Sequence, residues 1–84
     1  MEDGKGIDLI DSAAAFEIIG CGKSTAYKKI ERGLLPPLIK VGGRSRALRH
    51  EYQQIVRAYV CGLSEEEQQA LVQKQLEARK EVRP

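Results

Sequence analysis

The sequence predicts a mainly α-helical fold with a small β-hairpin wing, namely a winged helix-turn-helix followed by a C-terminal helix. Two short helical patterns are separated by a three-residue turn, Cys21-Gly22-Lys23, and such a short connection permits the steep crossing of a helix-turn-helix. Further along, two short extended runs flank Gly42-Gly43, a dipeptide typical of hairpin turns. The 84 residues are enough for one small domain. We expect the winged helix-turn-helix over residues 7–62 and a helical extension over residues 63–84.

The first part of the chain is expected to form a short extended segment and one short helix. Residues 7–10 are mostly apolar and predict a short strand or an extended lead-in. Asp11 or Ser12 can cap the following helix by accepting a backbone N–H. We expect this helix over residues 13–19, with Gly20 as its C-terminal stop. The residues expected on its inner face are Ala15, Phe16 and Ile19.

A second helix, expected over residues 23–32 and ended by Gly33, has a cationic outer face. At about 100° per residue, Ala26 and Ile30 fall close together and define the inner face. The opposite side is expected to carry Ser24, Thr25, Lys28 and Arg32, with Tyr27 and Lys29 at its two edges. A rigid helix that presents hydroxyl and basic groups has the shape and charge that fit the major groove of DNA.

The segment after the second helix predicts a basic wing. Pro36 and Pro37 prevent the helix from continuing, because proline lacks the amide donor. Gly42 and Gly43 supply the positive φ angles that a two-residue hairpin turn requires. We expect the apolar residues Ile39, Val41 and Leu48 to face inward, and the basic residues Lys40, Arg44, Arg46 and Arg49 to project outward or from the tip.

Two further helices are expected in the C-terminal half. The first begins at residue 50 or 51 and ends before Gly62. The second is expected over residues 65–79, because Ser64 and Glu67 form a capping box at its start. Its thin apolar stripe argues against a coiled coil and leaves open whether it docks on the core, pairs with a partner or stands partly free. The inner face of the earlier helix is expected to carry Tyr52, Ile55, Val56, Tyr59 and Val60.

Positive charge is concentrated in the middle of the chain. Residues 23–49 hold eight bases and one acid, for a net charge of +7. Residues 1–22 hold five acids and one base, and residues 50–84 hold six acids and five bases. A basic region that coincides with a helix and a hairpin is typical of a surface that binds a polyanion. The alternative is a solvated basic surface without a partner.

Catalytic and metal-binding patterns are not evident in the sequence. One histidine and two cysteines, Cys21 and Cys61, are too few ligands for a closed zinc site. We assign the cysteines no role, with a disulfide left open, and expect no enzymatic activity, no cofactor and no metal. The chain has no apolar run of bilayer length and no signal-peptide pattern at its start, so we expect a cytoplasmic protein without a membrane partner.

The order of these motifs resembles that of the AlpA family of phage and prophage regulators, within the wider MerR-like winged-helix and excisionase group. The resemblance covers residues 9–60 and rests on Gly20, Lys23-Ser-Thr-Ala-Tyr27, Ile30, Gly33, Leu35-Pro36 and Ile39-Lys-Val-Gly-Gly-Arg44. It implies that Lys23, Ser24, Thr25, Tyr27 and Lys28 approach DNA and that Arg44 lies on the wing. The chain departs from the family pattern at Gly22, Leu38 and Leu48, where serine, proline and tryptophan are common.

These observations predict sequence-specific binding of double-stranded DNA by a small regulator of transcription of phage or mobile-element type, encoded by a bacterium or a phage and associated with the nucleoid. The helix over residues 23–32 would enter the major groove, and the wing, residues 40–46, would contact the adjacent backbone or minor groove. The residues expected to bind DNA are Lys23, Ser24, Thr25, Tyr27, Lys28, Lys29, Arg32, Lys40, Arg44, Arg46 and Arg49.

Two alternatives stay open at this point. The nearer one is an excisionase, or recombination directionality factor, that bends DNA. The more distant one is a protein-interaction module, such as an antitoxin or adaptor, that contacts its partner through the helix over residues 65–79. Further partners to consider are a second copy on DNA, an integrase and RNA polymerase.

Overall fold

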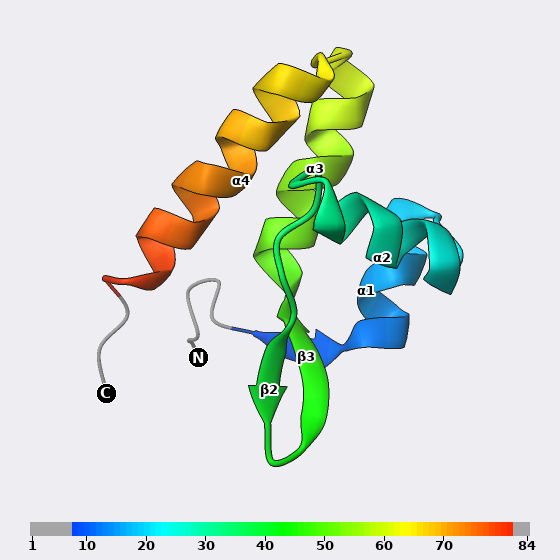
Figure 1. The fold of residues 1–84 in the computed structure, drawn as a ribbon, viewed down its shortest axis with the longest axis vertical. Coiled ribbons are helices and arrows are strands. Elements are labelled where there is room, and N and C mark those ends of the chain that lie inside the picture. Colours follow the sequence, from blue (N-terminus) through cyan, green and yellow to red (C-terminus); the bar gives the residue numbers. More distant parts are fainter. Residues whose placement is uncertain (1–7, 82–84) are drawn as a thin grey trace.

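The computed structural model describes residues 8–81, which form four helices and one three-stranded antiparallel sheet (Figure 1). In chain order the elements are β1 (Leu9–Asp11), α1 (Ser12–Ile19), α2 (Lys23–Glu31), β2 (Ile39–Val41), β3 (Arg44–Leu48), α3 (Arg49–Cys61) and α4 (Glu65–Arg79). The structure confirms the predicted mainly helical fold with a small β wing. Residue 7, the first of the expected lead-in, and residues 82–84 of the expected extension lie outside the described residues.

The sheet contains one strand more than the hairpin that the sequence predicts. β3 lies at its centre and pairs antiparallel with β2 on one side and β1 on the other. Ile10 of β1 lies opposite Ala47 of β3, so the lead-in segment extends the wing into a sheet. The turn between β2 and β3 has φ angles of 58° at Gly42 and 82° at Gly43, as a tight turn of two glycines requires.

Fewer apolar side chains of the wing are buried than the sequence predicts. Leu48 is buried and Ile39 is half-buried, as expected for residues that face the helices. The prediction for Val41 is wrong, because this side chain is 43% exposed. Val41 is the last residue before the turn, and the tip of the hairpin extends past the helices that cover the rest of the sheet (Figure 1).

The hydrophobic core lies between the sheet, α1, α2 and α3, and α4 also contributes to it. In Figure 1, α3 lies between α4 on one side and α1 and α2 on the other. Val60, predicted on the inner face of α3, is 82% exposed, and Ala58 is buried instead. The reason is that Val60 lies about 100° of helical turn beyond Tyr59, which is itself only half-buried at the edge of the core. The buried core residues are Ile10, Ala15, Phe16, Ala26, Leu35, Ala47, Tyr52, Ile55 and Val72.

The helix starts differ in how they are capped. Asp11 occupies the N-cap position of α1, but its side chain accepts no hydrogen bond from the helix, and the prediction of a side-chain cap there is wrong. Its carboxylate instead accepts a hydrogen bond from Arg46 on the wing. The capping box of α4 is confirmed, since Ser64 Oγ accepts from the Glu67 amide at 3.2 Å and Glu67 Oε1 accepts from the Ser64 amide at 2.9 Å.

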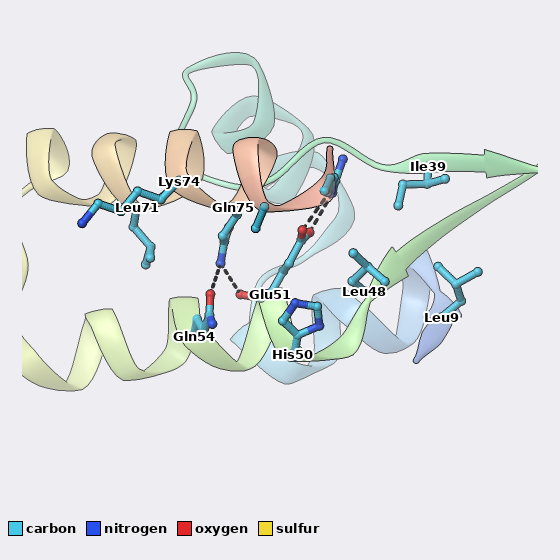
Figure 2. Close-up of a pocket in the computed structure, with 11 residues that line it drawn as sticks. Leu9, Ile39, Leu48, His50, Glu51, Gln54, Leu71, Lys74 and Gln75 are labelled. Carbon is cyan, nitrogen blue, oxygen red and sulfur yellow. Dashed lines mark hydrogen bonds and ion pairs between the residues drawn. The ribbon is translucent and has the colours of Figure 1, made fainter. Parts of the chain in front are cut away.

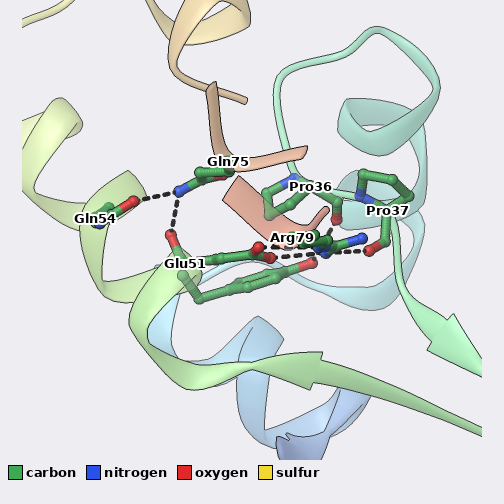
Figure 3. A network of polar contacts seen from close by, with 7 residues as sticks. Pro36, Pro37, Glu51, Gln54, Gln75 and Arg79 are labelled. Carbon is green, nitrogen blue, oxygen red and sulfur yellow. Dashed lines mark hydrogen bonds and ion pairs between the residues drawn. The ribbon is translucent and has the colours of Figure 1, made fainter. Parts of the chain in front are cut away.

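Helix α4 docks on the core through polar contacts with the start of α3 (Figure 3). Gln75 Nε2 donates to the backbone carbonyl of Glu51 at 3.0 Å and to Gln54 Oε1 at 2.8 Å. Arg79 donates twice to the Glu51 carboxylate, at 2.9 and 2.7 Å, and once to the carbonyl of Pro37 at 2.8 Å. These contacts settle the position of α4, which the sequence leaves open, in favour of docking.

The buried hydroxyl of Tyr52 should make stability depend on pH in the alkaline range. Burial, together with the charge of Glu51, raises the pKa of Tyr52 above its ordinary value of about 10. The folded state therefore retains this proton at a pH where the unfolded chain loses it. The resulting stabilisation is complete below about pH 10 and falls as the pH rises above that value, by up to about 1.4 kcal/mol per pH unit.

We expect the substitution Tyr52→Phe to flatten this alkaline decline, measured as the free energy of unfolding in urea between about pH 8 and 11. The variant also loses the hydrogen bond to the carbonyl of Pro36, so its stability at pH 8 should be lower by about 1 kcal/mol. Tyr27→Phe, which removes a hydroxyl from a partly exposed ring, is the matched control. An equal alkaline decline in wild type and Tyr52→Phe would contradict the prediction.

Candidate nucleic-acid interface

Helix α2 has one anchored face and one exposed face. Ala26 is fully buried and Ile30 packs against the core from a half-buried position, so this face of the helix is held in the core. The side chains of Ser24, Thr25 and Lys28 on the opposite side are all exposed. This arrangement follows from the helical period and places hydroxyl and ammonium groups on a rigid outward surface.

Side chains at the two edges of α2 contact the neighbouring helices α1 and α3. Tyr27 packs edge-on against Phe16 of α1, with ring centroids 5.5 Å apart and an interplanar angle of 79°. Lys29 Nζ donates to the hydroxyl of Tyr59 on α3 at 3.3 Å and lies 5.1 Å from the centroid of that ring. Lys29 is therefore directed towards α3, whereas part of the Tyr27 ring stays exposed beside the outward face.

Three of the predicted DNA-binding arginines form ion pairs with acids from outside the basic region. Arg32 pairs with Glu65 of α4 at 2.8 Å, and Arg49 pairs with Asp8 at 2.7 Å. Arg46 pairs with Asp11. The Arg32 and Glu65 side chains are 59% and 61% exposed, and such exposed pairs contribute about 0.2–1 kcal/mol. A phosphate group can therefore replace Glu65 at little cost in free energy, so this pair lowers the net charge of the surface but leaves Arg32 able to bind DNA.

Four predicted bases are exposed and have no acidic partner among residues 8–81, namely Lys23, Lys28, Lys40 and Arg44. Lys23 and Lys28 lie at the start and in the last turn of α2. Arg44 follows the glycine turn, and Lys40 lies opposite Ser45 in the hairpin. The hairpin that carries Lys40 and Arg44 projects beyond the helical part of the molecule (Figure 1).

Helix α4 also holds the C-terminal end of α2. Gln69 Nε2 donates to the backbone carbonyl of Arg32 at 2.8 Å, beside the ion pair between Arg32 and Glu65. Gln69 and Glu65 are not recognisable in the sequence as parts of this site. The capping box indicates only where α4 begins, and no local signal shows that its first two turns contact a helix more than thirty residues earlier.

The two cysteines do not form a disulfide, a possibility that the sequence leaves open. Cys21 is half-buried, Cys61 is exposed, and both are free thiols. Within residues 8–81, His, Cys, Asp and Glu side chains do not gather in threes to hold a metal ion. The helices of the same region are all too short or too polar to cross a membrane.

Comparisons with known proteins do not give a function for this surface. No protein-family model, curated protein or solved structure matches the chain. A functional conclusion therefore depends on the geometry and charge of α2 and the wing.

Proposed function

We propose that the chain binds double-stranded DNA, with α2 in the major groove and the β2–β3 wing on the adjacent backbone or minor groove. The observation that carries the proposal is the exposed face of α2, which presents Ser24, Thr25 and Lys28 while the opposite face is held in the core. The major groove, about 12 Å wide, admits one α-helix, and hydroxyl groups can hydrogen-bond to base edges there. Lysines on the same face can neutralise phosphates.

The wing supplies the second contact. Lys40 and Arg44 are exposed near the tip of a hairpin that extends past the helices (Figure 1). Basic side chains on such an extension can reach a neighbouring phosphate or the minor groove. A DNA-binding role of this kind, together with the AlpA-like motif order, favours a small regulator of transcription of phage or mobile-element type that acts in the cytoplasm on the bacterial nucleoid.

The salt dependence of binding tests the proposal directly. If the four exposed bases that have no acidic partner among residues 8–81 meet phosphates, the plot of log affinity against log salt should have a slope of about −3.6, whereas contacts by all eight bases would give about −7. Binding of a labelled mixed-sequence duplex can be followed by fluorescence anisotropy over a series of salt concentrations. Absence of binding at low salt would contradict DNA binding and favour a module that contacts proteins.

Arg44→Ala is expected to weaken binding to all duplex sequences by a similar factor and to make the salt slope less negative by about 1, because one phosphate contact is removed. Arg57→Ala, which removes an exposed arginine from α3, is the matched control and should leave the slope unchanged. A slope that is the same in wild type and Arg44→Ala would show that the wing does not contact the backbone.

Glu65→Gln is expected to strengthen binding to duplex DNA by about threefold, because it releases Arg32 from an exposed ion pair and removes one negative charge near α2. Glu66→Gln is the matched control, since both acids lie in the first turn of α4 and affect the helix dipole alike. The measurement is anisotropy at fixed salt. Equal gains for the two variants would indicate that only overall charge matters and that Arg32 takes no part.

A further inference from the structure

Glu31 places a carboxylate on the face of α2 that is proposed to enter the major groove. It is the single acid among residues 23–49, which hold eight basic residues. The side chain is exposed, and Glu31 is the last residue of the helix. Seven residues of an α-helix turn through about 700°, so Glu31 lies within about 20° of the direction of Ser24, with Lys28 between them along the helix axis. The outward face therefore combines a hydroxyl group, an ammonium group and a carboxylate.

The electrostatic setting of Glu31 is unfavourable in three respects. A carboxylate in the last turn of a helix is repelled by the negative end of the helix dipole. Glu31 forms no ion pair with a basic side chain among residues 8–81. It also reduces the attraction of the surface for phosphates. Neither the stability of α2 nor contact with the DNA backbone accounts for an acid at this position, whereas a contact with the edge of a nucleobase does.

The end of α2 that carries Glu31 is held in place by α4. Gln69 of α4 donates to the carbonyl of Arg32, the residue after Glu31, at 2.8 Å. Helix α4 is itself fixed to α3, because Gln75 donates to the carbonyl of Glu51 at 3.0 Å (Figure 2). A contact made from a preorganised position loses little conformational entropy on binding. The backbone of Glu31 therefore needs no ordering when the side chain meets a nucleobase.

Among the four nucleobases, cytosine is the one whose major-groove edge suits a carboxylate, because its N4 amino group is a donor. Guanine presents two acceptors there, and thymine presents an acceptor and a methyl group. Adenine presents a donor beside an acceptor, N7, which repels a carboxylate oxygen. A carboxylate in the groove therefore selects cytosine, whereas the hydroxyl groups of Ser24 and Thr25 both donate and accept and so discriminate less.

We propose that Glu31 is a specificity-determining residue, which accepts a hydrogen bond from the N4 amino group of one cytosine in the bound duplex. The inference rests on the proposed position of α2 in the major groove and adds a nucleobase that this helix recognises. Glu31 lies about 10 Å from Ser24 along the helix axis, and base pairs are spaced about 3.4 Å apart, so the two residues contact different base pairs.

The test begins with selection of preferred sequences by the full chain from a duplex library with a randomised central segment. Binding of the selected duplex, and of duplexes that carry each other base pair at each position, is then measured by fluorescence anisotropy. We expect one position at which replacement of cytosine weakens binding by about 5- to 150-fold. Glu31→Ala should lose the preference at this position alone. Glu31→Gln should prefer adenine there, because glutamine pairs with N6 and N7 of adenine.

Glu77→Gln is the matched control, because it removes one exposed carboxylate from α4 and should leave the preference for cytosine intact. The salt slope of Glu31→Ala should equal that of the wild type, since no phosphate contact is lost. An equal gain in affinity for every duplex, with unchanged base preferences in Glu31→Ala, would overturn the inference but leave DNA binding intact. Failure to bind any duplex of the library at low salt would overturn DNA binding, and the inference with it.

Discussion

Replacing Arg79 with alanine is expected to destabilise the folded chain by about 3–5 kcal/mol, the usual cost of leaving a buried charge without its partner. The side chain of Glu51 is only 2% exposed, and Arg79 donates to both of its carboxylate oxygens. Arg79 also donates to the carbonyl of Pro37, so its loss removes a third contact. The substitution therefore leaves a buried carboxylate without compensation and detaches the end of α4 from α3 and the proline segment (Figure 3).

The free energy of unfolding in urea, followed by circular dichroism, measures this loss. Arg49→Ala is the control, because it breaks an ion pair with Asp8 whose two side chains are both largely exposed and should cost less than about 1 kcal/mol. The double replacement Glu51→Leu with Arg79→Leu should recover much of the stability that Arg79→Leu alone loses, since no buried charge remains. Equal losses for Arg79→Ala and Arg49→Ala would show that Glu51 is solvated in the folded chain.

The sequence predicts features that depend on neighbouring residues. Gly42 and Gly43 define the hairpin turn because few other residues adopt positive φ at two successive positions. The residues of the α4 capping box are three positions apart, and the helix begins and ends where they and the helical pattern predict. The exposed face of α2 also follows from local periodicity, so Ser24 and Lys28 could be placed before the structure was known.

Features that depend on distant residues are not predictable in this way. Asp11 has the sequence context of a helix cap, yet its carboxylate pairs with Arg46 because β1 joins β3 in register. Arg32 faces outward as the period requires, but Glu65 reaches it only because α4 folds back along α3. Each of these outcomes is set by the tertiary arrangement, which the local pattern does not encode.

Reversal of the charge at Lys28 should be the most severe single change for DNA binding. Lys28→Glu is expected to weaken binding to duplex DNA by about 2–3 kcal/mol, or about 30- to 150-fold, because it removes a positive contact and places a carboxylate beside phosphates. Lys28 is exposed in the last turn of α2, so reversal there should cost the fold only about 0.3–1 kcal/mol through the helix dipole. Circular dichroism can verify that the variant remains folded at the temperature of the binding measurement.

Lys80→Glu is the control that distinguishes the effect of the position of the charge from the effect of the total charge. Lys80 is exposed at the C-terminal cap of α4, and the substitution changes the net charge by the same two units. Charges separated by more than the Debye length, about 10 Å at 0.1 M salt, interact weakly, so this control should lose less than about threefold in affinity. If both variants lose affinity equally, the duplex responds only to total charge, and α2 does not enter the groove. A large loss for Lys28→Glu alone places the contact on α2, because the two chains then differ only in where the carboxylate stands.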